Sequence, residues 1–468
     1  MRSVSNFVRV AGLAACVLAV AGCGGTAPSG QQLSFVPSFP PAGTLPPVET
    51  DFDVVGRDIE ISDVPTTSAS AATTAGAIQS NVQPFASRKL KFFIHGMDYS
   101  PTQVGQPVNN NPLGSGNAAI WQRDIPLLRA MGVNAIHVYN VDPNVNGPID
   151  NALKALWNNN SKPIFVVFSI HFGATCLNST GCANDLATQY YNLDKKYATN
   201  PAVLGGTISN EINPCNQATD PQCGIPSNAT YWNNFNIIAK RAKQGFADGG
   251  DKSKLVMTSN VDDNNYTLSQ GEKFGAAVDV WGINVYRGRG FVYTGQTGDL
   301  FAQIRATTTK PVVITEYGGT AGWHPKGSIG KTYKYPLSDG SGACQPAGGL
   351  PYAITDIAPM PATGKISMAG LNDLVTFSNT QLYQGWKSDG VVSGGFYFEW
   401  TDEWWKQNPD NPAARSTHWG NANVVDSYPA CARDEAWYGL NAISPGTALA
   451  PRSTLTTLKN VWAKQPTT

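Results

Sequence analysis

From residue 89 onwards, short apolar runs alternate with longer segments in which apolar residues recur every three or four positions. The short runs predict buried strands, and the longer spacing predicts amphipathic helices that pack against them. The predicted strands are Lys91–Gly96, Ala135–Tyr139, Pro163–Ser169, Val203–Ser209, Leu255–Ser259, Val278–Asn284, Pro311–Thr315 and Gly394–Glu399. The predicted helices include Ile120–Met131, Asn184–Tyr197, Tyr231–Ala247, Leu371–Lys387 and Ser453–Trp462. This repeated alternation is typical of an α/β protein with a (β/α)8 TIM barrel.

The predicted barrel domain, residues 88–468, is longer than the roughly 250 residues of a typical barrel. Most of the surplus follows the seventh strand, at Gly318–Ala369, and the eighth, at Trp400–Arg452. Loops that follow barrel strands lie on the carboxyl-terminal face, where barrels place their active sites. We therefore expect both long loops to border the functional site.

Residues 1–22 have the pattern of a secretory signal, with Arg2 and Arg9 before an apolar run that ends in small residues. The run is too short to span a bilayer comfortably as a mature helix. Val20-Ala-Gly-Cys23 resembles a bacterial lipobox, in which the cysteine is lipidated and becomes the new N-terminus. We expect an exported lipoprotein anchored to the cell envelope through Cys23. An ordinary signal peptide is the alternative.

Pro, Ser, Thr, Ala and Gly dominate residues 23–87, which predicts a flexible tether behind the lipidated cysteine. Within it, residues 51–62 have the pattern of a small strand pair. In a Gram-negative cell, Gly24 after the cysteine favours the outer membrane. The sequence has no second apolar stretch of transmembrane length, so the lipid is the expected membrane anchor.

Acidic and basic residues balance, with 33 Asp+Glu against 33 Lys+Arg. Removal of residues 1–22 takes away Arg2 and Arg9 and no acid, which leaves two more acids than bases. Nucleic acids are bound by clustered positive charge, so we expect no nucleic-acid partner. Hydrophobic residues make up 41% of the chain, which is enough for a sizeable core and excludes wholesale disorder.

Six cysteines lie beyond the lipobox, and an even number in an exported protein indicates disulfides. Short spacing favours the pairs Cys176–Cys182 and Cys215–Cys223, which leaves Cys344–Cys431 as a long-range pair. A zinc site is the alternative, but the chain has no CxxC pair and its five histidines are scattered.

Two glutamates come directly after apolar runs, Glu211 after the fourth predicted strand and Glu316 after the seventh. The carboxyl ends of barrel strands converge on one pocket, so we expect these side chains to meet there. Cleavage of a glycosidic bond uses two carboxyl groups, and a separation of about 5–5.5 Å gives retention through a covalent glycosyl-enzyme. Either glutamate alone is also consistent with a solvated loop residue. Both together at these strand ends favour catalysis.

The glutamates after strands four and seven resemble those of clan A retaining glycoside hydrolases. Within that clan the chain resembles the fungal cell-wall β-1,3-glucanosyltransferases of glycoside hydrolase family 72, over about residues 88–400. The matching stretches, in family order, are Phe92–Tyr99, Gln122–Gly132, Asn134–Tyr139 with Asp142 and Pro143, Ser209–Ile212, Thr258–Asn260 with Asp262 and Asp263, Gly282–Tyr286, Thr315–Gly318, and Ser393–Gly395 with Glu399.

The resemblance implies a role for each matching polar residue. Glu211 is the expected acid/base and Glu316 the expected nucleophile. Asn210 is expected to hold the sugar 2-hydroxyl, and Tyr286 to hydrogen-bond and orient Glu316. The residues expected to line the donor subsites are Asp98, Tyr99 and Tyr139, with ordinary packing at the barrel mouth as the alternative.

One position departs from the family pattern, which has arginine on the second strand where this chain has His137. A permanent cation beside the nucleophile would lower its pKa, whereas histidine does so only when protonated. Either the local charge balance differs here or another group, such as Arg287, compensates. A packed barrel histidine is the plainer alternative for His137.

Tryptophans cluster on and after the eighth strand, where flat aromatic faces can stack on sugar rings. They are Trp400, Trp404, Trp405, Trp419 and Trp437, and Trp323 lies in the loop after the seventh strand. We expect some of them to pack the loops and others to bind sugar, with Trp400 the first choice for binding. Among the neighbouring acids, Glu399 and Glu403 are candidates to bind hydroxyls, and Asp402 is expected at a solvated edge.

The sequence lacks the motifs of phosphate, zinc-protease and serine-hydrolase sites. Asp262–Asn265 lacks the spacing of a calcium loop, and we expect no metal and no organic cofactor. The predicted function is retaining cleavage of β-1,3-glucan with transfer to a glucan or to water. The alternatives are hydrolysis of another β-glycan, such as mannan or mixed-linkage glucan, and a non-catalytic carbohydrate-binding surface lipoprotein.

Overall fold

The computed structural model describes residues 51–62, 89–102, 111–142, 145–213, 227–287, 291–292, 298–319, 335–336, 343–344, 368–403, 438–443 and 448–468. Within these ranges, every helix is too short or too polar to cross a membrane.

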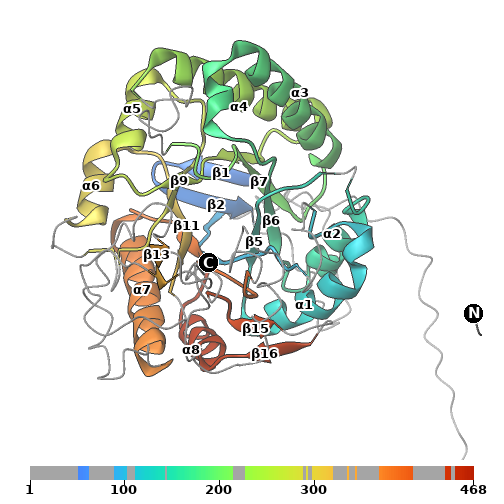
Figure 1. Cartoon of the computed structure of the whole chain (residues 1–468), viewed down its shortest axis with the longest axis vertical. Helices are drawn as coiled ribbons and strands as arrows, with labels where there is room; N and C mark the ends of the chain where they lie inside the picture. Colours follow the sequence, from blue (N-terminus) through green and yellow to red (C-terminus); the bar gives the residue numbers. More distant parts are fainter. Residues whose placement is uncertain are drawn as a thin grey trace, which may run out of the picture. The chain divides into compact units, whose positions relative to one another are not determined.

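Parallel strands close into a barrel, which confirms the predicted fold (Figure 1). The barrel strands are β4 (Ile94–Asp98), β5 (Ala135–Val138), β6 (Phe165–Ser169), β7 (Val203–Thr207), β8 (Leu255–Met257), β10 (Trp281–Asn284), β11 (Val312–Gly318) and β14 (Gly394–Phe398). Their hydrogen-bonded order is β8-β7-β6-β5-β4-β14-β11-β10-β9, where β9 (Asn260–Val261) continues the segment of β8. Because β8 and β9 stand at opposite ends of this order, and a bridge joins Met257 to Val280, the sheet closes on itself.

Helices surround the strands, as Figure 1 shows. They are α1 (Ala118–Met131), α2 (Asp150–Trp157), α3 (Thr180–Tyr197), α4 (Ala229–Gly249), α5 (Tyr266–Phe274), α6 (Leu300–Thr307), α7 (Met368–Asp389) and α8 (Ser453–Trp462). All five helices predicted from periodicity are present. Short 3₁₀ turns lie at Ser115–Asn117, Asn158–Asn160 and Ala174–Asn178, and small two-stranded sheets pair β12 (Tyr335–Pro336) with β13 (Ala343–Cys344) and β15 (Asn441–Ile443) with β16 (Leu449–Pro451).

Local chemistry sets the ends of several helices. The Asn228 and Asp299 side chains accept backbone N–H groups at the first turns of α4 and α6, which satisfies donors that a helix start leaves free. Gly132 and Gly250 end α1 and α4 with φ values of 98° and 109°, a region that glycine enters at little cost. These signals hold the helix lengths close to those predicted.

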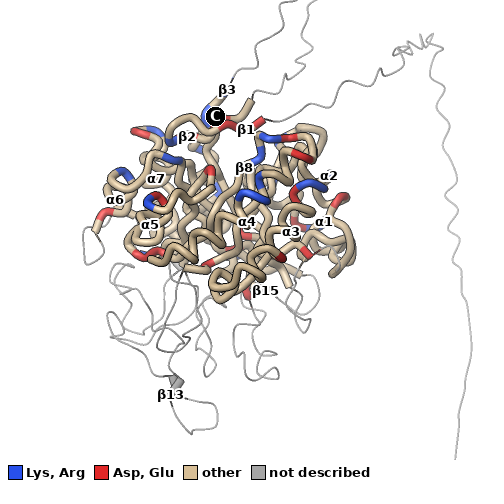
Figure 2. Tube along the Cα trace, turned by 90° about the horizontal axis from the view of Figure 1, so that it is seen from above, with Lys and Arg blue, Asp and Glu red and all other residues tan. Residues whose placement is uncertain are grey.

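The amino-terminal end of the barrel is covered by a hairpin of β1 (Phe52–Val55) and β2 (Asp58–Ser62), extended by β3 (Lys89–Lys91). These strands lie together in Figure 2, at the end of the barrel opposite to β15. The Phe52 ring packs at 5.1 Å from that of Phe165, and the Phe92 N–H donates to the Ile59 carbonyl at 2.7 Å. The strand pair expected at 51–62 is confirmed, but it packs on the barrel, because its aromatic side chain completes the core, and is not part of a free tether.

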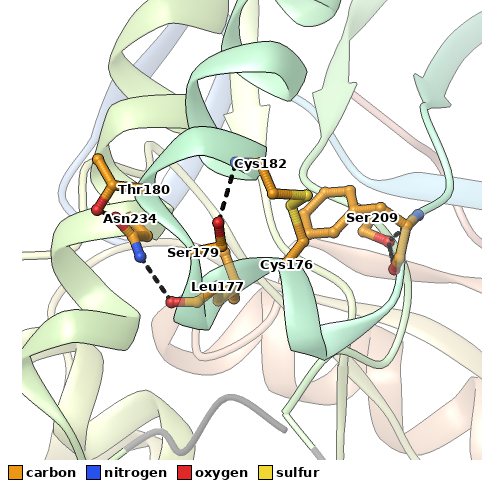
Figure 3. The surroundings of a disulfide bond; sticks show 8 residues. Cys176, Leu177, Ser179, Thr180, Cys182, Ser209 and Asn234 are labelled. Atoms are coloured by element: carbon orange, nitrogen blue, oxygen red, sulfur yellow. Dashed lines mark hydrogen bonds between the residues drawn. A yellow bond between two sulfur atoms is a disulfide. The ribbon is translucent and has the colours of Figure 1, made fainter. Parts of the chain in front are cut away.

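A disulfide joins Cys176 to Cys182, as the sequence predicts, and closes a short loop before α3 (Figure 3). Within this loop the Ser179 hydroxyl accepts the Cys182 N–H at 3.3 Å and caps the helix. The other expected pairs lie outside the described residues, since Cys215, Cys223 and Cys431 fall there and only the backbone of Cys344 is described. Helix, cap and disulfide together fix the segment that precedes α3.

Asp194 of α3 is a carboxyl group buried between helices α3 and α4 and strand β7, at 1% exposure. Neither of its oxygens meets a hydrogen-bond donor among the described residues. Burial raises the pKa of Asp194 well above its ordinary value, so the native state keeps the proton. An unfolded chain releases that proton above about pH 4, so folding stability falls as the pH rises from there towards the raised pKa.

We expect Asp194→Asn, which has the shape of the protonated acid and does not ionise, to remove this pH dependence. Its melting temperature should exceed that of the unmodified chain by a few degrees at pH 8, and the difference should shrink towards pH 4. Thermal unfolding at a series of pH values measures it. Asp185→Asn, an exposed acid on the same helix, is the matched control. A difference that does not change with pH would show that Asp194 is ionised in the folded chain.

Candidate active site

Glu211 and Glu316 both lie at the carboxyl-terminal end of the barrel, where the sequence predicts them. Glu316 is inside β11, two residues before its end, and its carbonyl accepts the Val285 N–H at 2.7 Å. Glu211 follows β7, and its N–H donates to the Ser259 carbonyl at 2.7 Å. Neighbouring strands therefore fix the backbone of each glutamate at the same mouth.

The last residue of β10 and the residue two positions after it provide one hydrogen-bond donor for each glutamate. Asn284 Nδ2 donates to Glu211 Oε1 at 2.9 Å, and the Tyr286 hydroxyl donates to Glu316 Oε2 at 2.7 Å. Residues two apart on a strand point to the same side, so both donors face the mouth. The segment 284–286 thus stands between the two carboxyl groups and orients both.

Glu316 is held by two tyrosines and is only 6% exposed. Its Oε1 accepts the Tyr139 hydroxyl at 2.8 Å, in addition to the Tyr286 bond on Oε2. Burial, with nearby acids second, raises the pKa of both tyrosines well above the ordinary value, so they stay protonated and remain donors. Donors on both oxygens favour the ionised carboxylate. Tyr139, expected only to line a subsite, is the second partner of Glu316.

Glu211 lies in a different environment, since its side chain is exposed. Asn210 beside it is oriented by two donors, because its Oδ1 accepts Ser259 Oγ at 2.7 Å and Asn284 Nδ2 at 3.2 Å. The Thr315 hydroxyl in turn donates to Asn284 Oδ1 at 2.7 Å. With Oδ1 occupied, the Asn210 Nδ2 donor is directed away from this network. A buried carboxylate and an exposed carboxyl group at one mouth suit different proton-transfer roles.

The backbone before Glu211 is held in an unusual conformation. Ser209 and Glu211 have φ values of 56° and 50°, a left-handed region that costs roughly 1–3 kcal/mol for a residue other than glycine. The Ser209 hydroxyl donates to the Phe172 carbonyl at 2.8 Å and accepts the Phe172 N–H at 3.1 Å. The Tyr190 hydroxyl also accepts the Ser209 N–H at 2.9 Å. These contacts stabilise the turn that presents Glu211.

Asp98 and His137 lie fully buried under the mouth. His137 Nδ1 is 2.9 Å from Asp98 Oδ1, and its Nε2 is 3.3 Å from Thr207 Oγ1. Burial lowers the pKa of His137 to about 3, so the imidazole is neutral in the working range. Burial, and then the nearby Glu316 charge, raises the pKa of Asp98 well above its ordinary value. His137 therefore supplies no cation to the nucleophile position.

Arg287, the candidate to compensate for the missing cation, has an acidic partner of its own. Its guanidinium, almost fully buried, forms an ion pair with Asp262, in which Nη2 lies 2.7 Å from Asp262 Oδ1. Asp263 in the same loop accepts the Thr267 N–H at 3.0 Å and so stabilises the start of α5. The Asp262–Asn265 segment is therefore a structural loop. Among the described residues, no cluster of three His, Cys, Asp or Glu side chains is close enough to hold a metal ion.

Tyr99 does not line the mouth as expected. Its hydroxyl donates to Asp124 Oδ2 of α1 at 3.0 Å, and its side chain is fully buried. Consecutive residues of an extended segment point to opposite sides, so with Asp98 facing the barrel interior, Tyr99 faces the helix layer. Tyr99 therefore packs the helix against the sheet and has no access to a ligand in the mouth.

The acids and the tryptophan after β14 are buried. Trp400 is 1% exposed and packs in the apolar core, so its ring presents no open face to a sugar. Glu399 is fully buried, and its carbonyl accepts the Leu440 N–H at 2.8 Å. Asp402, expected at a solvated edge, instead forms a buried bidentate ion pair with Arg452 at 2.6 and 2.8 Å. The remaining tryptophans of the predicted cluster, Trp323, Trp404, Trp405, Trp419 and Trp437, lie outside the described residues.

Three polar residues of the site were not identified from sequence as partners of the glutamates: Asn284, Ser259 and Thr315. Asn284 ends β10 and Tyr286 lies two residues further on, a spacing that in extended backbone puts both side chains on the same side. Ser259 and Thr315 are small hydroxyl residues, and their contribution appears only when three strands are brought together. A separate cavity of about 520 Å³ lies at the other end of the barrel, near Phe92, Phe165 and Trp462, and its described lining has no acidic side chain.

Comparisons with known proteins agree with this geometry. A family profile described as glucanosyltransferase, of glycoside hydrolase family 72, matches residues 66–324. The 1,3-beta-glucanosyltransferase GAS5 of Saccharomyces cerevisiae is 23% identical over 263 residues, which cover 54% of this chain and 50% of that protein. For the 1,3-beta-glucanosyltransferase gas5 of Schizosaccharomyces pombe the identity is 24% over 263 residues, covering 53% and 48%. The chain spans about half the length of these curated relatives.

A solved structure supports the fold at low sequence identity. Saccharomyces cerevisiae Gas2p in complex with laminaritriose and laminaritetraose superposes with a TM-score of 0.50 at 15% identity, covering 89% of this chain and 69% of that one. At this identity the likeness confirms the barrel fold alone.

Proposed function

The chain belongs to the glucanosyltransferases of glycoside hydrolase family 72, and from this premise we propose that it cleaves β-1,3-glucan and transfers the released chain to a second glucan or to water. The observation that carries the proposal is the pair of donors at the end of β10 and just beyond it, Asn284 on Glu211 and Tyr286 on Glu316. Two oriented carboxyl groups in unlike environments are the equipment of a retaining glycosidase.

In the first step, the Glu316 carboxylate attacks the anomeric carbon of the bound glucan and forms a glycosyl ester. The bond from that carbon to the bridging oxygen breaks, and Glu211 gives its proton to the departing oxygen. The tyrosine donors on Glu316 support this assignment, because they favour the ionised nucleophile. The exposure of Glu211 supports the other role, because an acid/base must exchange protons with each incoming group.

In the second step, the roles of the acid/base reverse. Glu211, now a carboxylate, takes the proton of an incoming hydroxyl, whose oxygen attacks the anomeric carbon and releases Glu316. If the hydroxyl belongs to another glucan the product is a longer chain, and if it belongs to water the product is shorter. Asn210 Nδ2 is suited to donate to the sugar 2-hydroxyl, a contact that strengthens in the transition state.

The tyrosine donors lead to a prediction for Tyr286→Phe and Tyr139→Phe. Each removes one hydrogen bond from the ionised form of Glu316, so the nucleophile pKa should rise and the acidic limb of the kcat/KM profile should move to higher pH. We expect kcat at the optimum to fall about 10- to 100-fold. Rates across pH 3–8 on a laminari-oligosaccharide measure both. Tyr266→Phe, exposed on α5, is the control. If the acidic limb keeps its position in both variants, the tyrosines do not affect the pKa of Glu316.

Product analysis tests the function itself. The purified chain is incubated with laminaripentaose, and the products are sized by mass spectrometry. Products longer than five sugars establish transfer, and only shorter ones establish hydrolysis. If the chain gives no products from laminaripentaose but cleaves mannan or mixed-linkage glucan, it is a hydrolase of another β-glycan. Binding of these glycans without turnover would make it a carbohydrate-binding protein.

We also propose that the chain is exported and held at the bacterial cell envelope by a lipid on Cys23. The residue pattern of 1–23 supports this, and the Cys176–Cys182 disulfide suits an oxidising compartment. In a Gram-negative host the outer membrane is the expected site. Metabolic labelling with a fatty acid should mark the chain in its bacterial host, and Cys23→Ser should abolish the label and release the protein from the membrane fraction.

A further inference from the structure

A buried acid–imidazole pair lies directly under the tyrosine that contacts the nucleophile. Asp98 of β4 and His137 of β5 are fully buried and 2.9 Å apart, and Thr207 of β7 closes the chain on the far side of the imidazole at 3.3 Å. The three side chains cross the barrel interior just below the mouth.

The imidazole of His137 packs against the ring of Tyr139. The ring centres of His137 and Tyr139 are 4.6 Å apart, and the His137 ring also packs against Phe396 at 5.7 Å. Tyr139 meets Phe398 edge-on at 6.4 Å and donates its proton to Glu316 Oε1 at 2.8 Å. The position of His137 therefore determines where the Tyr139 hydroxyl lies relative to the nucleophile.

The charges around Asp98 are acidic. Burial comes first in raising its pKa, and Glu316 of β11 and Glu403, after β14, raise it further, while the hydroxyl of Tyr139, just after β5, opposes the rise. Tyr139 has one proton, and that proton is donated to Glu316. Asp98 Oδ2 meets no donor among the described residues, which is costly for a buried carboxylate and far less so for a carboxylic acid.

The other described ionisable groups nearby add no positive charge that would stabilise an ionised Asp98. Tyr286, two residues after β10, is protonated and donates to Glu316, and His137 is neutral because burial lowers its pKa to about 3. Arg287 is paired with Asp262, and Arg452 is paired with Asp402. A proton on Asp98 that is donated to His137 Nδ1 leaves Nε2–H to donate to Thr207, so every close contact of the pair has one donor and one acceptor.

We propose that Asp98 and His137 form an uncharged positioning pair that holds Tyr139 against Glu316 and leaves the nucleophile as the ionised group at this side of the mouth. The inference rests on the function proposed above, since it concerns the same site. Asp98 acts as a carboxylic acid that donates a hydrogen bond, not as a second anion. Without the Asp98 side chain, the imidazole of His137 is no longer held in place, and the Tyr139 ring that packs on it can move away from Glu316.

Two substitutions at Asp98 separate this role from that of a charge. Asp98→Asn keeps a neutral hydrogen-bonding group of the same shape, and Asp98→Ala removes it. We expect kcat to fall about 100-fold in Asp98→Ala and less than about tenfold in Asp98→Asn, with KM changed by less than about threefold in both. The acidic limb of the kcat/KM profile should keep its position in Asp98→Asn. Equal losses in the two variants, or a limb that moves to lower pH in Asp98→Asn, would overturn the proposal, because both require an ionised Asp98.

A readout that needs no turnover accompanies the kinetics. Nitrogen-15 signals of the histidine rings report the protonation of His137, which His137→Gln assigns by the loss of a signal. The proposal predicts that His137 is neutral from pH 5 to pH 8, and exposed His171 supplies a second ring signal in the same spectra for comparison. An imidazolium signal from His137 at pH 7 would overturn the neutral pair. If the unmodified chain has no activity on laminari-oligosaccharides, the proposed function fails while this signal still decides the state of the pair.

Discussion

Replacing Glu316 by alanine is expected to lower kcat on laminari-oligosaccharides by at least about 10,000-fold, because alanine has no carboxylate with which to form the glycosyl ester. The tyrosine bonds identify Glu316 as the ionised partner, since each of its oxygens accepts a phenol proton. Single-turnover and steady-state rates measure the loss. The substrate should still bind, so its dissociation constant should change by less than about tenfold.

A control variant tests whether the loss is specific to a glutamate at the mouth of the barrel. Glu60→Gln alters a glutamate of β2, at the other end of the barrel, and should leave the rate unchanged. Equal melting temperatures for the Glu316→Ala and unmodified chains would show that folding is retained. If Glu316→Ala kept a tenth of the activity or more, Glu316 would not be the nucleophile, and the buried acids after β14 would have to be tested in its place.

Loss of the acid/base should have an effect that depends on the leaving group. Glu211→Gln keeps the Asn284 contact but cannot supply a proton, so kcat on a glucan should fall about 100- to 10,000-fold. On a laminari-oligosaccharide β-fluoride, formation of the glycosyl-enzyme should be much less affected, because fluoride departs with little need for protonation. Burst kinetics with the two substrates measure the difference.

The basic limb of the pH profile gives a second readout for Glu211. In the unmodified chain this limb reports loss of the acid/base proton, so it should disappear in Glu211→Gln. Equal losses on glucan and on the fluoride would contradict the assignment, because a residue that only shapes the site does not distinguish leaving groups. Asn210 is not a suitable control here, since it shares the Asn284 donor with Glu211.

Much of the fold could be predicted from periodicity, because barrel strands are buried on both sides and their apolar runs stand out. The hairpin at 51–62 shows where composition misleads. Its polar, turn-rich surroundings indicate a tether, yet Phe52 and Ile59 are buried in the core that closes the barrel. A few apolar side chains decide the outcome, and average composition does not detect them.

The glutamates could be found from sequence because a charged residue directly after an apolar run is conspicuous. Their partners were harder to identify. Tyr139 and Asp98 lie far apart in sequence from Glu316, and only the closed barrel brings them near it. Tyr99 was misassigned because adjacent residues of a strand face opposite sides, so Asp98 and Tyr99 cannot both face the interior.

Burial also gives single residues a role that differs from the one expected from sequence. Asp402 is charged and was expected in solvent, but Arg452, fifty residues later in the chain, pairs with it inside the protein. His137 replaces the expected cation with a neutral ring, because the barrel interior desolvates it and lowers its pKa to about 3. Neither result follows from residue type alone. The first depends on the partner that the fold brings to Asp402, and the second on how deeply the fold buries His137.

The most direct test of the central claim is to trap the intermediate. The Glu211→Gln chain is mixed with a laminari-oligosaccharide β-fluoride, which forms the glycosyl ester but leaves it without a base for its breakdown. Intact-mass measurement, followed by peptide mapping, should find one added glucan chain, attached to the peptide that contains Glu316. An adduct on another residue, or turnover of the fluoride with no adduct and an inverted first product, would contradict double displacement at Glu316.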